Sequence, residues 1–241
     1  MNGSKLEILA YEMSELGPLC LRRRELLTRP GTVVTEVTLN HEFLMSSLYT
    51  KSERALARSA INLHGGTDLR VLIGGFGLGY TAREALLSDR VSAVVVDELL
   101  PQIIDWLAQG LMPLSSELNQ MQRLNVVQAD VYERLQGPPD DLFDVILIDV
   151  DHSPDERLGD ENISFYTAPG LLAAQRHLAV NGVLAVWSYA ESSPFADALQ
   201  SVFSQVIVKP VSHYNDLIDE QLTDWLFIAR GQPDVTADHS S

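Results

Sequence analysis

The stretch Val71–Leu86, which reads VLIGGFGLGYTAREAL, decides the fold of this chain. Its first three residues, 71–73, are apolar and typical of a buried strand. A glycine-rich loop follows, and then a run from Tyr80 to Leu87 whose apolar residues have helical spacing. Glycines let the backbone approach a ligand closely, and the free N–H groups at a helix start favour polar or anionic groups. The stretch therefore predicts a strand, a loop and a helix that bind a nucleotide-like ligand.

From this stretch onward, strand patterns alternate with helical patterns. Further strands are predicted at 91–96, 125–129, 143–149, 183–188, 205–210 and 224–230. Helices are predicted at 101–109, 164–178 and 195–203. No helical pattern separates the last two strands, so we expect them to form an antiparallel pair at one sheet edge. The alternation predicts an α/β fold with a doubly wound, mostly parallel sheet, which binds ligands at the carboxyl ends of its strands.

The residues before the glycine-rich loop have a different pattern. Residues 1–48 contain strand patterns around turns at 16–18 and at 40–41, and a helical stretch covers 49–62. A polar tail begins at Gly231. We therefore expect a small N-terminal β-region (1–48), an α/β domain (49–230) and a tail (231–241).

The composition excludes several classes of function. The 241 residues carry a formal net charge of −16, which argues against the basic surface that nucleic acids and anionic membranes require. The one basic cluster, Arg22–Arg24, alternates within a strand pattern and is typical of a solvated edge strand. Cys20 is the only cysteine, which excludes an intramolecular disulfide and a cysteine metal cluster. With neither a signal-peptide pattern nor a membrane-length apolar run, we expect a cytoplasmic protein. The acidic net charge favours a neutral or cationic small-molecule substrate over an anionic one.

Acidic residues follow successive predicted strands of the α/β domain. Asp97 and Glu98 follow the second strand, Asp130 follows the third, and the run Asp149-Val150-Asp151-His152 comes after the fourth. Because the loops after neighbouring parallel strands meet at one crevice, we expect these side chains to lie together. Carboxylates accept hydrogen bonds from ribose hydroxyls and from an adenine amino group. The pattern therefore favours a nucleoside ligand.

Each of these residues also has a structural interpretation. Asp97 or Glu98 can begin the next helix, where a carboxylate suits the helix dipole. Asp130 can be a helix N-cap, alone or in addition to binding a ligand, and His152 can be a surface-loop residue. Asp149 ends an otherwise apolar strand, and a buried unpaired carboxylate is costly, so we expect its side chain at an open crevice.

Two ligands fit the glycine-rich loop. Residues 77–82 match the dinucleotide fingerprint, and Asp97 lies about 20 residues further on, as in NAD-binding proteins. An NAD enzyme needs a second unit for its substrate, however, whereas the residues after Asp149 continue the same sheet. An S-adenosyl ligand needs one nucleoside pocket and one sulfonium pocket, which fits this chain better.

The order of the motifs resembles that of class I S-adenosylmethionine-dependent transferases, and more narrowly the spermidine-synthase-like group. The motifs are GGFGLGYTAREAL, VVVDELLPQIIDW, NVVQADVYERL, FDVILIDVDHSP and GVLAVWS. The resemblance covers about residues 30–230 and includes the β-region before the loop. It implies a Rossmann-like methyltransferase fold and a homodimer formed through the N-terminal β-region.

The resemblance also implies roles for single residues. It assigns the methionine part and ribose to Gly75, Gly77 and Gly79, the ribose hydroxyls to Asp97 or Glu98, and the adenine amino group to Asp130. Asp149 then faces the sulfonium and the acceptor. The ligand is S-adenosylmethionine or its decarboxylated form.

The chain departs from true spermidine synthases in three places. They resemble GGGDGG at the loop, where the aspartate lies near the amine of decarboxylated S-adenosylmethionine, whereas Phe76–Leu78 supply no carboxylate. After the fourth strand they carry D-S/T-S/T-D-P, whereas in Asp149–Pro154 the second aspartate is displaced and a histidine stands in its place. The Tyr-His-Glu run of their polyamine pocket is not evident at 49–53.

The leading hypothesis is therefore transfer of an alkyl group, most simply methyl, from S-adenosylmethionine to a small acceptor. Asp149, Asp151 or His152 accepts the acceptor's proton in this hypothesis. Three aromatic residues are candidates for the acceptor pocket: Tyr166, Trp187 and Tyr189. Core packing is the alternative interpretation of Trp187, and the one we expect for Trp106 and Trp225.

Three other hypotheses remain. Aminopropyl transfer from decarboxylated S-adenosylmethionine to a polyamine is favoured by the acidic charge and opposed by the missing loop carboxylate. The others are a non-catalytic binding or dimerisation module and an NAD-dependent enzyme. No motif identifies the acceptor, because acceptor loops are variable parts of such folds.

Overall fold

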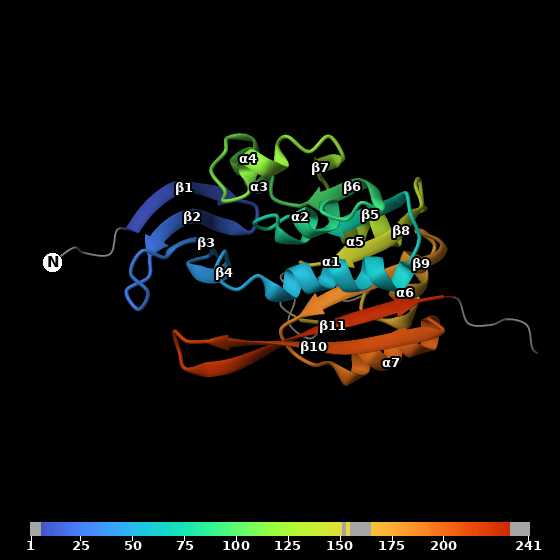
Figure 1. Cartoon of the computed structure of the whole chain (residues 1–241). Helices are drawn as coiled ribbons and strands as arrows, with labels where there is room; N and C mark the ends of the chain where they lie inside the picture. Colours follow the sequence, from blue (N-terminus) through green and yellow to red (C-terminus); the bar gives the residue numbers. More distant parts are fainter. Residues whose placement is uncertain (1–5, 151–152, 155–164, 232–241) are drawn as a thin grey trace, which may run out of the picture.

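The structure is a computed structural model that describes residues 6–150, 153–154 and 165–231. Two sheets form its frame (Figure 1). A four-stranded antiparallel sheet has the order β1-β2-β3-β4, and a seven-stranded sheet has the order β10-β11-β9-β8-β5-β6-β7. The predicted α/β fold with a small N-terminal β-region is confirmed.

The N-terminal sheet consists of two successive hairpins. Its strands are β1 (Leu6–Ser14), β2 (Gly17–Glu25), β3 (Val33–Leu39) and β4 (Glu42–Ser46). The second hairpin turns at Asn40 and His41, which have φ angles of 52° and 68°. Two successive residues with positive φ are typical of the turn that joins twisted antiparallel strands.

The interpretation of Arg22–Arg24 as a solvated edge strand is wrong. These residues belong to β2, which lies between β1 and β3. Glu36 on β3 is buried, and the guanidinium groups of Arg22 and Arg24 approach its two carboxylate oxygens to 2.9 and 2.7 Å. Two of the three arginines therefore neutralise a buried carboxylate, and their pairing lowers the pKa of Glu36 against the effect of its burial.

The large sheet is parallel except at one edge. Its strands are β5 (Leu69–Gly74), β6 (Val91–Glu98), β7 (Leu124–Gln128), β8 (Phe143–Ile148), β9 (Leu178–Ser188), β10 (Gln205–Asn215) and β11 (Glu220–Arg230). Strands β5 to β9 pair in parallel. Strand β11 runs antiparallel to both β9 and β10, which confirms the predicted antiparallel pair at the sheet edge.

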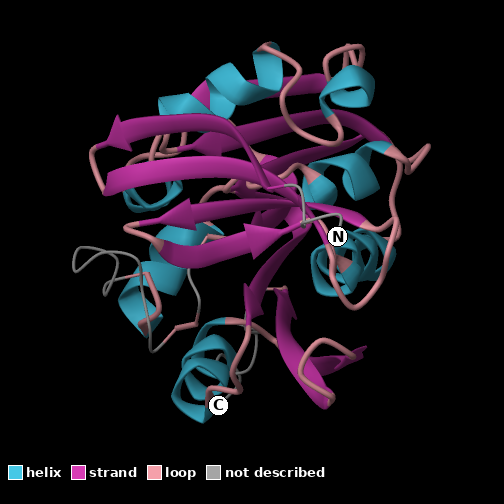
Figure 2. Cartoon of the chain, turned by 90° about the vertical axis from the view of Figure 1, so that its left-hand side faces the viewer, coloured by secondary structure: helices cyan, strands magenta, loops and turns pink. Residues whose placement is uncertain are grey.

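Helices cover both faces of the large sheet (Figure 2). One face packs against α1 (Lys51–His64), α2 (Tyr80–Leu86) and α3 (Pro101–Ala108), and the other against α5 (Val131–Gln136), α6 (Ala168–Gln175) and α7 (Ser193–Val202). Successive residues of a strand point to opposite faces, so Val71 and Ile73 pack with the first group and Leu72 with the second. Leu21 and Val37 of the N-terminal sheet join the first core.

Several elements differ in length from the sequence prediction. Helix α6 begins at Ala168 rather than near 164, since Thr167 caps it and proline occupies its first turn. A short helix, α4 (Ser115–Leu118), was not predicted. Strands β10 and β11 extend to Asn215 and from Glu220, so their hairpin is longer than expected. Within the described residues, no helix is both long and apolar enough to cross a membrane.

Candidate active site

The carboxyl ends of four parallel strands lie side by side. Gly74 at the end of β5 is opposite Asp97 on β6 and opposite Ile148 on β8. Glu98 at the end of β6 is opposite Gln128 on β7. The loops after these strands therefore meet at one edge of the sheet, as the sequence predicts.

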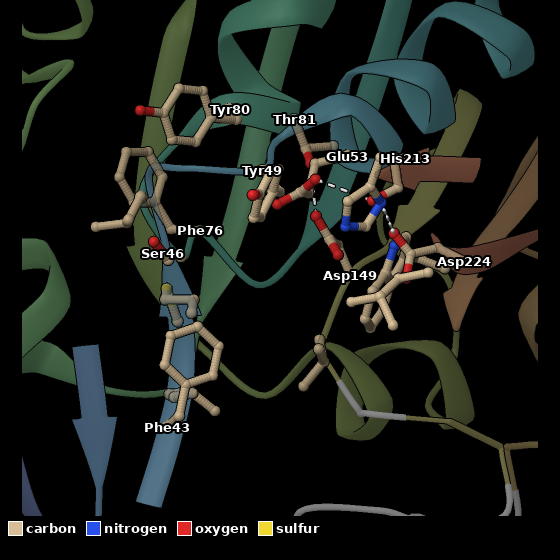
Figure 3. A pocket seen from close by; sticks show the side chains of 18 of the residues that line it. Phe43, Ser46, Tyr49, Glu53, Phe76, Tyr80, Thr81, Asp149, His213 and Asp224 are labelled. Carbon is tan, nitrogen blue, oxygen red and sulfur yellow. Dashed lines mark hydrogen bonds and ion pairs between the residues drawn. The ribbon is translucent and has the colours of Figure 1, made fainter. Parts of the chain in front are cut away.

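A cavity of about 310 Å³ opens at this edge. Its wall is formed by β4, the start of α1, the glycine-rich loop, the end of β8 and the facing sides of β10 and β11 (Figure 3). Arg29, between β2 and β3, forms an ion pair with Asp216 at the turn of the β10–β11 hairpin. The hydroxyl of Tyr49, which lines the cavity, donates a hydrogen bond to the same carboxylate at 2.6 Å. The hairpin is thereby attached to the N-terminal sheet beside the cavity.

Among the described residues, three carboxyl groups line the cavity: those of Glu53 on α1, Asp149 after β8 and Asp224 on β11. Thr81 Oγ1 on α2 donates a hydrogen bond to Asp149 Oδ2 at 2.6 Å, which orients this carboxylate. Asp149 therefore lies at the cavity, as the sequence predicts for a carboxylate at a strand end.

The three carboxyl groups are close enough to affect one another's ionisation. Burial, together with the charge of Asp224, raises the pKa of Asp149 to about 6. Burial, together with the charge of Asp149, raises the pKa of Glu53 to about 8. Burial also raises the pKa of Asp224. Carboxyl groups with raised pKa values that gather in a cavity are typical of functional sites.

His213 and Tyr49 are two further polar residues that line this part of the cavity. His213 on β10 places its Nδ1 atom 3.9 Å from Asp224 Oδ2, and its ring packs against that of Tyr49 with 4.9 Å between centroids. Sequence reasoning missed Glu53, His213 and Asp224. Alternation of side chains along the hairpin was the signal that could have revealed these residues. Leu222 and Asp224 share one face of β11, and His213 on β10 is paired with Leu222.

The three glycines of the loop differ in what a side chain at their positions would contact. Gly75, Gly77 and Gly79 all have positive φ, at 84°, 56° and 87°. A Cβ atom at Gly75 would lie 2.5 Å from the carbonyl oxygen of Asp149, and one at Gly79 would lie 2.6 Å from Leu118 Cδ1. Gly77 lines the cavity, and its Cβ would meet only the side chain of Met45. A side chain would therefore meet backbone at position 75 and the side chains of Leu118 and Phe76 at position 79, whereas Gly77 faces the cavity.

Glu98 holds the glycine-rich loop in place. Its side chain is buried, and its two oxygens accept hydrogen bonds from the backbone N–H groups of Phe76 and Leu100, each at 2.8 Å. Burial raises the pKa of Glu98, and these hydrogen bonds act in the opposite direction. The structure therefore joins the end of β6 to the loop after β5 and to the start of α3.

Asp97 and Asp130 have partners within the protein. Asp97 is 1% exposed and accepts hydrogen bonds from Arg134 Nε and Nη2 at 2.5 and 3.1 Å. Asp130 accepts hydrogen bonds from the N–H groups of Tyr132 and Glu133 at 2.8 and 3.4 Å. The N-cap interpretation of Asp130 is confirmed, and an N-cap carboxylate retains further acceptor sites.

The remaining candidates divide into three groups. Asp151 and His152 lie outside the described residues. Trp187 lines the cavity, whereas the candidates Tyr166 and Tyr189 are not among the residues that line it. Trp106 is fully buried and Trp225 packs against the second core, which confirms the core interpretation of both.

Comparison with known proteins shows which fold this chain has. No family model matches the chain, and no curated protein matches its sequence. A crystal structure of a spermidine synthase in complex with the transition state analogue AdoDATO superposes with a TM-score of 0.73 over 95% of this chain and 75% of that chain, at 20% sequence identity. The fold is that of spermidine synthases. The spermidine synthase from Thermotoga maritima gives a TM-score of 0.72 at 19% identity, with the same coverage of both chains.

The spermidine synthase fold includes both sheets of this chain, because the superposition covers nearly all of it. This confirms the fold that the motif order implied.

Proposed function

We propose that this chain is a transferase that uses an S-adenosyl ligand and moves an alkyl group to an amine. The observation that carries the proposal is the convergence of Glu53, Asp149 and Asp224 on a cavity beside the glycine-rich loop. Among the described residues that line this cavity there is no lysine or arginine. A cationic ligand would therefore supply the positive charge that the protein does not place beside these three carboxyl groups.

The residues at the sheet edge fit the donor. The backbone of the loop, with Gly75, Gly77 and Gly79, would carry its methionine part and ribose. We assign the ribose hydroxyls to Glu98 rather than to Asp97. The charge of Asp97 is balanced by its ion pair with Arg134, whereas the hydrogen bonds that Glu98 accepts come from neutral backbone N–H groups. Asp130 would bind the adenine amino group in addition to capping α5.

We propose aminopropyl transfer, from decarboxylated S-adenosylmethionine, as the reaction. The fold shared with spermidine synthases and the acidic cavity favour it over methyl transfer. Methyl transfer is the second candidate, favoured by the absence of a carboxylate at Phe76–Leu78.

We propose Asp149 as the proton acceptor. The amine nitrogen forms a bond to the carbon of the transferred group while the bond from that carbon to sulfur breaks, and the sulfur keeps the electron pair. The amine must lose a proton, and a carboxylate that Thr81 holds in one orientation can accept it. Asp151 and His152 remain proposed alternatives for this role.

The identity of the product tests the proposal. The protein is incubated with an amine panel and either donor, and the nucleoside product is identified by mass spectrometry. Methylthioadenosine would support aminopropyl transfer, and S-adenosylhomocysteine would show methyl transfer instead. If calorimetry detected binding of neither donor, the chain would be a non-catalytic module and the proposal would be wrong.

A further inference from the structure

The cavity has two chemically different sides. Glu53, Asp149 and Asp224 lie on one side, whereas Phe43, Phe76 and Tyr80 lie on the other (Figure 3). Met45 on β4 and Leu78 in the loop add to the apolar lining. A ligand that fills this space therefore meets carboxyl groups on one side and apolar groups on the other.

Two of the apolar residues are open to solvent although they line a cavity. Phe43 on β4 is 58% exposed, and Leu222 on β11 is 36% exposed. Covering such side chains with an apolar group removes apolar surface from water and stabilises the complex. Leu222 also lies on the same face of β11 as Asp224, so an apolar contact is available beside a carboxylate.

The carboxyl groups are gathered rather than distributed. Glu53, Asp149 and Asp224 lie together on one side of the cavity, and a hydrogen bond from Thr81 holds Asp149 there (Figure 3). A linear diamine carries two separated ammonium groups, which two separated carboxyl groups would serve best. Among the described lining residues, the carboxyl groups form one cluster, which suits one ammonium group.

We infer that the acceptor is an amine with an apolar or aromatic substituent, whose nitrogen lies among the three carboxyl groups and whose substituent covers Phe43 and Leu222. This inference rests on the proposed transferase function and specifies the acceptor of the same site. It distinguishes the site from one that selects a linear polycation.

The test compares two primary amines, the aromatic 2-phenylethylamine and the linear 1,4-diaminobutane. Affinity is measured by calorimetry on the full chain with methylthioadenosine present, and turnover is measured with both donors. We expect 2-phenylethylamine to bind at least about tenfold more tightly. Phe43→Ala and Leu222→Ala should each weaken its binding by about tenfold and leave that of 1,4-diaminobutane nearly unchanged. Glu53→Gln should weaken both.

Leu172→Ala is the matched control, because Leu172 is an exposed leucine on α6 and is not among the residues that line the cavity. Tighter binding and faster turnover of 1,4-diaminobutane would overturn the inference and leave the proposed function intact. Equal effects of Phe43→Ala and Leu222→Ala on both amines, in variants with unchanged circular dichroism, would also overturn it. Absence of binding and turnover with either amine and either donor would overturn the proposed function as well.

Discussion

Asp149 is the residue on which the proposed chemistry depends. We expect Asp149→Asn to lower turnover by about 100-fold or more, because an amide cannot accept the proton that the amine must lose. The affinity for the donor should change little, since the loop and Glu98 remain. Turnover is measured from the nucleoside product and donor affinity by calorimetry.

Asp105→Asn is the control for this substitution, since Asp105 is an exposed aspartate on α3 and is not among the cavity-lining residues. Full turnover in Asp149→Asn would show that another group accepts the proton.

The raised pKa of Glu53 predicts how stability depends on pH. The pKa is about 8 in the folded chain against an ordinary value of 4.5, so the folded state binds this proton more tightly than the unfolded state does. The contribution of Glu53 to stability is therefore fully present below about pH 4.5 and is lost as pH rises to about 8. Glu53→Gln should reduce this loss, so the variant should gain stability relative to the parent chain between pH 5 and pH 9, as urea unfolding would measure. A constant difference across this range would contradict the prediction.

At the scale of elements, Glu98 connects the end of β6 to the glycine-rich loop and to the start of α3 through two backbone hydrogen bonds. A glutamine has one acceptor oxygen, so Glu98→Gln would leave the N–H of Phe76 or of Leu100 without a partner. We expect the free energy of unfolding to fall by about 1–3 kcal/mol. Urea unfolding measures this loss, and the same measurement on Glu133→Gln, an exposed glutamate on α5, is the control. A loss equal to that of the control would show that the two bonds contribute nothing to stability.

The glycine-rich loop should respond differently at neighbouring positions. Gly75→Ala would place a Cβ atom 2.5 Å from a backbone oxygen, so part of the loop must move. Gly77→Ala would add about 1–2 kcal/mol of left-handed backbone strain and meet only the flexible side chain of Met45. We expect Gly75→Ala to reduce the free energy of unfolding more, and Gly77→Ala to weaken donor binding. The reverse order of the two stabilities would show that the loop tolerates a displacement at Gly75.

At the scale of the whole molecule, the N-terminal sheet presents an apolar row. Leu6, Ile8, Tyr11 and Met13 on β1 are all exposed. A register shift between Ile8 and Ala10 places all four on one face despite their uneven spacing. We expect this face to form the homodimer that the sequence resemblance implies, because large contiguous apolar patches are rare on monomers and often mark interfaces.

Light scattering on a size-exclusion column tests this expectation. The parent chain should have the mass of a dimer, and Ile8→Glu together with Met13→Glu should convert it to a monomer. A monomeric parent chain would contradict the prediction, and a dimeric double variant would place the interface elsewhere.

The order of strands and helices and the position of the glycine-rich loop were predictable from the sequence. Hydrophobic periodicity, glycine turns and proline positions act over a few residues, so they are visible in a single chain. The same local chemistry placed Asp149 at the crevice and allowed for Asp130 as an N-cap; in the structure Asp149 lines the cavity and Asp130 caps α5.

The tertiary structure alone decided which charges meet. Glu53 precedes the large sheet and Asp224 lies on its penultimate strand in spatial order, yet both line the cavity beside Asp149. Likewise, Arg134 forms an ion pair with Asp97, and Arg22 and Arg24 form ion pairs with Glu36 within the N-terminal sheet. These contacts depend on strand order and register, which arise from packing between distant segments and leave no local pattern. The sequence by itself thus determined the fold and the places of the glycine-rich loop and Asp149 at the strand ends, whereas the cavity lined by acidic and apolar residues exists only once the chain is folded.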